Sequence, residues 1–117
     1  MTTINIFRHA RDVQRYTAGE TIFESGARGQ LMYMVMVGTI DIYQDGQITN
    51  TLGPDELFGE MALIDDGPRS ATAIARTDCT LARVNEAQFV RMVHDTPYFA
   101  LNVMRVLVER LRVTMQA

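Results

Sequence analysis

The 117-residue chain has few of the residues that build disulfides, metal centres or catalytic triads. Cys79 is its only cysteine, so the chain can form no internal disulfide, and nothing indicates an oxidising compartment. Its two histidines, His9 and His94, are far apart in the sequence and belong to no cluster of histidine and carboxylate ligands. Neither Ser25 nor Ser70 has a coupled histidine base in the sequence. We therefore expect no bound metal and no enzymatic activity.

Long apolar runs and an excess of positive charge are also absent. The longest apolar run, residues 31–37, is far shorter than the ~20 residues that a membrane helix requires. The N-terminal segment has no apolar stretch of the secretory-signal type. Eleven basic and fourteen acidic side chains give a net charge of −3, the wrong sign for neutralising phosphates. We expect a cytoplasmic protein with neither a membrane nor a nucleic acid as partner.

What is present fits one globular domain rich in β-structure. The length is that of one domain, and the hydrophobic share of 47% is ordinary for soluble proteins. Glycines divide the first two thirds into segments as long as short strands. Residues 31–37 are apolar at both odd and even positions, which predicts a strand buried on both faces. Residues 40–52 alternate around Asp45-Gly46 and predict a hairpin with a tight turn.

Helical periodicity replaces this pattern in the last third of the chain. The Asn85 or Glu86 region can cap a short helix that ends before Pro97, with apolar residues at Phe89, Val90 and Val93. A second helix follows from Tyr98, with a stripe at Ala100, Met104, Leu107, Leu111 and Thr114. We predict one domain over residues 1–117, with a β-roll over about 11–85 and C-terminal helices over about 86–116.

Residues 58–73 (FGEMALIDDGPRSATA) contain the candidate binding site. Gly59 permits close backbone approach, and the residues after it favour a one-turn helix whose free N–H groups attract a phosphate. Arg69 leads into a strand with small side chains, which leaves space beside the guanidinium. Such a guanidinium can pair with two oxygens of an anion. Glu60 would repel that anion unless it faced a donor such as a sugar hydroxyl, so the pair predicts a nucleotide.

The motifs GE, MAL and PRSATA, in this order and spacing, resemble the phosphate-binding cassette of the cyclic nucleotide-binding domain family. The resemblance extends to YTAGETIF, GPDELFGE and TDCTLARVNEAQF, and so covers nearly the whole chain. It implies a mainly β fold with flanking helices. This fold is an eight-stranded, jelly-roll-like β-roll with a short phosphate-binding helix and C-terminal helices. The chain is similar to the sensor domain of catabolite activator-type bacterial regulators.

The resemblance also assigns roles to individual residues. Glu60 would bind the ribose 2′-hydroxyl and Arg69 the cyclic phosphate. The remaining contacts to the sugar and phosphate would come from Gly59, Met61, Ala62, Ser70 and Ala71. In the family the residue after the arginine bears on the choice of purine, and Ser70 favours cyclic AMP over cyclic GMP. The last helix resembles the one that contacts the base and a second subunit, which would place Thr114 near the adenine.

The resulting hypothesis is a regulatory sensor domain that binds a cyclic nucleotide and needs no cofactor. Since no helix-turn-helix follows the last helix, we expect a stand-alone module without its own effector or DNA-binding domain. Its output would pass through an unknown effector protein. The apolar stripe of the last helix either only packs on the roll or also forms a homodimer. The alternative function is a protein interaction module with the same fold that no longer responds to nucleotide.

Overall fold

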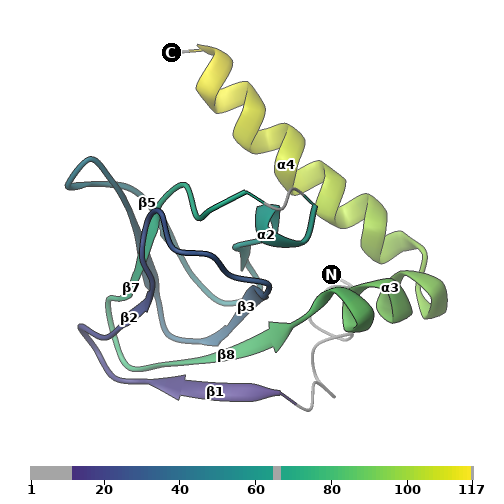
Figure 1. Cartoon of the computed structure of the whole chain (residues 1–117), viewed down its shortest axis with the longest axis horizontal. Coiled ribbons are helices and arrows are strands. Elements are labelled where there is room, and N and C mark those ends of the chain that lie inside the picture. The colour runs from purple at the N-terminus through teal and green to yellow at the C-terminus, as the bar shows by residue number, and fades with distance from the viewer. Residues whose placement is uncertain (1–11, 65–66, 117) are drawn as a thin grey trace.

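The computed structural model describes residues 12–64 and 67–116, and side chains only up to Leu111, so His9 and the Thr114 side chain lie outside the described residues. Over this part of the chain, eight strands form two antiparallel four-stranded sheets (Figure 1). The first sheet has the order β1 (Val13–Tyr16), β8 (Cys79–Val84), β3 (Met32–Val37) and β6 (Leu57–Phe58). The second has the order β2 (Thr21–Phe23), β7 (Thr72–Ala75), β4 (Ile40–Gln44) and β5 (Gln47–Leu52). The helices are α2 (Met61–Ile64), α3 (Glu86–Asp95) and α4 (Tyr98–Gln116).

Strand β3 carries both halves of the core, because successive side chains of a strand point to opposite faces. Tyr33 and Val35 join a buried cluster that draws residues from both sheets and fills the roll. Met32 and Met34 join a second cluster, on the face of the first sheet that the C-terminal helices cover. This confirms the predicted strand with two buried faces, and with it the mainly β architecture with flanking helices.

Two local predictions, a turn and a helix cap, are also confirmed. Asp45 and Gly46 link β4 to β5 with φ angles of 53° and 79°, the left-handed region that this tight hairpin turn requires. Asn85 caps α3 through a reciprocal pair of hydrogen bonds with Gln88, each of 2.8 Å. Helix α3 ends at Asp95, before Pro97, as predicted.

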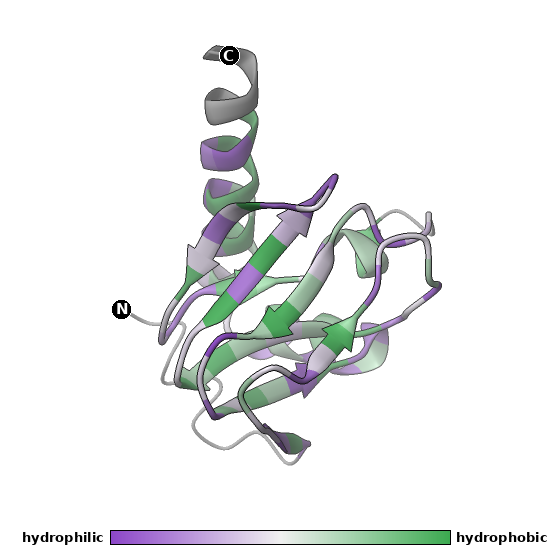
Figure 2. Cartoon of the chain, turned by 90° about the vertical axis from the view of Figure 1, so that its left-hand side faces the viewer, coloured by the Kyte–Doolittle hydropathy of each residue, from purple (hydrophilic) through white to green (hydrophobic). Residues whose placement is uncertain are grey.

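Helix α4 docks on the roll through a face that includes Leu107 of the predicted stripe but not Met104 or Leu111. Phe99 and Val103 are buried in the second cluster, and Leu107 packs partly against it. Met104 and Leu111, which belong to the predicted stripe, are instead 57% and 59% exposed. Apolar residues surround much of this helix, so spacing alone did not identify the docking face. Figure 2 shows apolar and polar colours on different sides of the visible part of α4.

None of the helices within residues 12–64 and 67–116 is long and apolar enough to cross a membrane.

Candidate functional site

The site lies in the connection between β6 and β7, which contains the one-turn helix α2. Gly59 follows β6 directly and has a φ of +74°, a conformation that side chains rarely allow. A Cβ added there would lie 2.9 Å from Nη1 of Arg69 and 3.3 Å from the Tyr33 ring. Glycine at position 59 therefore satisfies both an unusual backbone angle and the close approach of Arg69.

Arg69 is buried, with 8% of its surface exposed, and its guanidinium is held from several sides. Nη1 donates to the carbonyl oxygen of Gly59 at 3.1 Å, and Nη2 donates to that of Leu31 at 2.8 Å. Its Cζ atom lies 4.1 Å from the centre of the Phe23 ring, a cation–π distance. These contacts fix the position of a positive charge inside the roll.

The Arg69 guanidinium still lacks an acceptor for its Nε–H group. Burial lowers the pKa of Arg69, while the charges of Tyr33 and Glu60 raise it in part, and an arginine remains a cation under all ordinary conditions. Among the described residues, Nε of Arg69 is the one buried side-chain nitrogen or oxygen without a hydrogen-bond partner. Buried polar groups are nearly always paired, so this N–H on a buried cation is a donor that an oxygen of a bound anion could use.

Glu60, the residue before α2, is also buried, with 4% of its surface exposed. Its Oε1 atom lies 2.5 Å from Nη1 of Arg110 in α4, and Nη2 of Arg110 donates to the Leu57 carbonyl oxygen. Such a cation offsets the cost of burying a carboxylate. An ionised carboxylate has about four acceptor positions, so Glu60 retains capacity for another donor. The ion pair of Glu60 and Arg110 joins the connection between β6 and β7, here called the cassette, to α4. Helix α4 passes close to α2 (Figure 1).

The remaining predicted site residues differ in how far they are exposed. Ser70 is exposed and Ala71 half-buried, directly after Arg69. Met61 is 53% exposed, and the Ala62 N–H donates to the Gly59 carbonyl oxygen at 3.2 Å inside the turn of α2. Position 114 belongs to α4, but its side chain lies outside the described residues. The structure thus brings Gly59, Glu60 and Arg69 together, and leaves the base contact untested.

The sequence analysis did not identify Arg110 as the partner of Glu60, or Phe23 as the ring that packs against Arg69. A signal for Arg110 existed, because a carboxylate predicted to lie in a site needs a nearby cation. Arg110 follows Val106 and Leu107 by four and three positions, which puts this cation on an apolar side of the last helix. Fifty positions separate it from Glu60, however, and no local pattern selects it among the arginines of that helix. Within the described residues no group of three or more histidine, cysteine, aspartate or glutamate side chains is placed to hold a metal.

Known proteins have a similar sequence and the same fold. The chain is 37% identical over 102 residues to the cyclic AMP receptor protein of Thermus thermophilus, which covers 83% of this chain and 47% of that protein. It therefore spans about half the length of this relative. The solved Thermus thermophilus catabolite activator protein superposes with a TM-score of 0.83 at 32% identity, covering 96% of this chain and 55% of that chain.

A second solved structure comes from work on a cyclic-GMP-dependent signalling pathway that regulates bacterial phytopathogenesis. It superposes with a TM-score of 0.79 at 34% identity, covering 92% of this chain and 89% of that chain. Residues 13–96 match the family described as the cyclic nucleotide-binding domain, and this range contains all eight strands, α2 and α3. On this match and these likenesses, the chain belongs to the cyclic nucleotide-binding domain family.

Proposed function

We propose that this chain is a regulatory sensor domain without catalytic activity, which binds cyclic AMP between Arg69 and Glu60. The observation that carries the proposal is the buried Arg69 guanidinium with an unpaired Nε–H, close to a buried carboxylate. A cyclic nucleotide offers one anionic phosphate and one free ribose hydroxyl, at the 2′ position. These two groups match the charge and hydrogen-bonding capacity of the two side chains.

The phosphate would bind to the guanidinium N–H groups that the Gly59 and Leu31 carbonyl oxygens do not hold. Two of the five N–H groups of the guanidinium already bond to these carbonyl oxygens, which leaves Nε–H and two others for ligand oxygens. Phosphate binding therefore needs no rupture of the contacts that hold Arg69. By resemblance, Ser70, Ala71 and the amides around Gly59, Met61 and Ala62 complete the cradle.

The ribose 2′-hydroxyl would donate to Glu60, which accepts from Arg110 at the same time. In this arrangement the ligand, Glu60, Arg110 and α4 form one continuous chain of hydrogen bonds. The ligand can shift α4 from one position to another only if it binds the protein more tightly with α4 in the second position. We infer that α4 carries the response to an effector protein.

We assign the choice between cyclic AMP and cyclic GMP to Ser70 and Thr114. Ser70 favours cyclic AMP by resemblance, and the Thermus thermophilus relative is named a cyclic AMP receptor. Cyclic GMP is the second candidate, because a similar structure comes from a cyclic-GMP-dependent pathway. Thr114 follows Arg110 by four residues, and residues four apart share a helix face. We therefore retain Thr114 as the proposed contact to the base.

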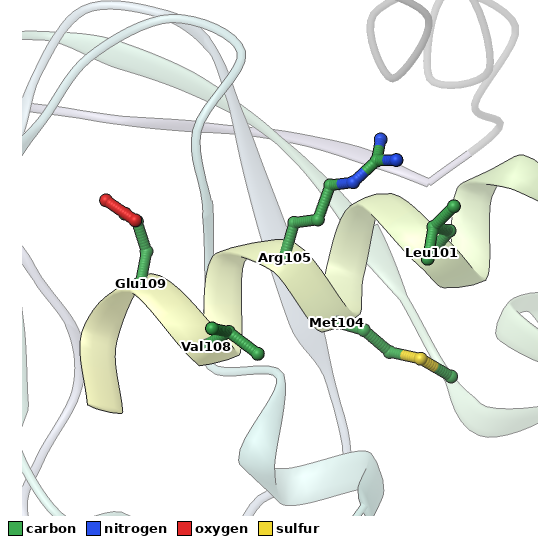
Figure 3. Close-up of a pocket in the computed structure, with 5 residues that line it drawn as sticks. All are labelled: Leu101, Met104, Arg105, Val108 and Glu109. Atoms are coloured by element: carbon green, nitrogen blue, oxygen red, sulfur yellow. The ribbon is translucent and has the colours of Figure 1, made fainter. Parts of the chain in front are cut away.

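The outward face of α4 supports a homodimer as part of this function. Its exposed apolar residues repeat at three-four-three spacing, the a/d spacing of a coiled coil: Leu101, Met104, Val108 and Leu111. The first three line a surface pocket together with Arg105 and Glu109 (Figure 3). In that view Arg105 and Glu109 point away from Met104 and Val108, so the apolar seam is flanked by charges of both signs. A second copy of α4 fits such a seam.

Met104→Glu is expected to convert a dimer into a monomer, because it places a charge at the centre of the seam. The measurement is the solution mass by sedimentation or light scattering, with the wild type at twice the 13.2 kDa of one chain. Val90→Glu is the control, since Val90 is 60% exposed but lies on α3. A monomeric wild type, or a dimeric Met104→Glu variant, would contradict the seam.

Thermal unfolding with and without ligand tests the proposed function. Cyclic AMP at a hundred times its dissociation constant should stabilise the domain by about 2.7 kcal/mol, which raises Tm by roughly 10 °C. Cyclic GMP should stabilise it less, and linear AMP least. Equal unfolding in all samples would instead favour the interaction module that no longer responds to nucleotide.

A further inference from the structure

Gly29, in the segment between β2 and β3, has no backbone reason to be glycine. The described glycines with positive φ are those at 19, 26, 38, 46 and 59, and Gly29 is not among them. A left-handed backbone conformation is therefore not the reason for glycine at this position. The constraint on this position must therefore come from its surroundings.

That constraint is the guanidinium of Arg69. A Cβ added at Gly29 would lie 2.6 Å from Nη2, 2.8 Å from Nε and 2.9 Å from Cζ of Arg69. Gly59 stands against Nη1, where a Cβ would lie at 2.9 Å. Two glycines from distant segments thus enclose one guanidinium, and only their lack of side chains allows it.

Neither the guanidinium nor the segment 25–31 can withdraw easily. Main-chain bonds of 2.8 Å run from Gly26 N–H to the Arg69 carbonyl and from Arg69 N–H to the Ala27 carbonyl. The Ser25 N–H donates to Thr72 Oγ1 at 3.0 Å. On the guanidinium itself, the Leu31 carbonyl bonds Nη2 and the Phe23 ring packs against Cζ. A methyl group at position 29 would displace the guanidinium from this arrangement.

We propose that Gly29 is a positioning residue for anion binding, which acts through Arg69 by fixing where the Nε edge of its guanidinium lies. This inference rests on the proposed function, because the anion is the phosphate of the cyclic nucleotide. It adds a residue forty positions away from Arg69 that touches no ligand and still sets the affinity.

Gly29→Ala is expected to weaken cyclic AMP binding about tenfold, because the added methyl group overpacks the site and displaces the guanidinium from the position in which it meets the phosphate. Gly53→Ala is the matched control. Gly53 also lacks a positive φ, and the nearest atom to its added Cβ is 4.0 Å away. Affinity should be unchanged in this control. A wild type that binds cyclic AMP together with a Gly29→Ala variant that binds equally well would overturn the positioning role.

Unfolding without ligand shows whether the effect passes through Arg69. Gly29→Ala should lower Tm by several degrees in the wild type and by almost nothing in Arg69→Ala, where the obstructing guanidinium is gone. The same decrease in Tm in both backgrounds would show that Gly29 does not act through the Arg69 guanidinium, and would overturn the proposal. These measurements need no ligand, so they test the contact between Gly29 and Arg69 even if no cyclic nucleotide binds and the proposed function fails.

Discussion

Arg69→Ala is expected to weaken cyclic AMP binding by about a hundredfold or more. A phosphate in the proposed site accepts at least two charge-assisted hydrogen bonds from the guanidinium, each contributing about 1.5 to 3 kcal/mol. Within the described residues the Nε–H of this buried arginine has no hydrogen-bond partner, so the substitution removes donors that the phosphate would use. Calorimetric titration of cyclic AMP into both proteins measures the difference.

Two further variants make this prediction specific. Arg69→Lys keeps the charge but loses the planar fork, and should bind with intermediate affinity. Arg91→Ala removes an exposed arginine of α3, away from the cassette and from the seam of α4, and should bind like the wild type. Circular dichroism shows whether each variant is folded. A folded Arg69→Ala protein with unchanged affinity would exclude Arg69 as the phosphate ligand.

Glu60→Gln is expected to reduce cyclic AMP affinity by roughly ten- to a hundredfold and to abolish the preference for ribose. A hydrogen bond from a hydroxyl to a buried carboxylate contributes about 1.5 to 3 kcal/mol, and the amide accepts it more weakly. The substitution also removes the negative charge beside Arg110, which weakens the contact between the cassette and α4. Titrations with cyclic AMP and 2′-deoxy cyclic AMP, each into wild type and variant, separate the two effects.

In these titrations the wild type should bind the ribose form more tightly, and Glu60→Gln should bind both forms with similar affinity. Asp95→Asn serves as control, because Asp95 is an exposed carboxylate at the end of α3 and lies outside the site and the seam. If Glu60→Gln kept the full preference for the ribose form, the 2′-hydroxyl would not be the group that Glu60 binds.

The sequence predicted those parts of the fold that depend on near neighbours. Both parities of residues 31–37 are apolar because β3 contributes to two cores. Asp45-Gly46 specifies a hairpin turn by its φ angles, and Asn85 specifies the start of α3 by its capping side chain. Each of these signals lies within a few residues of the element that it defines.

The parts that could not be predicted depend on contacts between distant segments. Glu60 meets Arg110 across fifty positions, and Arg69 meets Gly29 across forty. The docking face of α4 was ambiguous for a related reason, since Phe99 and Met104 are equally apolar and only the packed roll separates them. Local periodicity identifies an amphipathic helix, whereas the partner decides which side is buried.

The most direct test is a calorimetric titration of the wild-type chain with cyclic AMP, cyclic GMP and linear AMP. Our account predicts saturable heat with one cyclic AMP per chain, weaker binding of cyclic GMP, and the weakest response to linear AMP. No saturable heat with either cyclic nucleotide at millimolar concentration would contradict it.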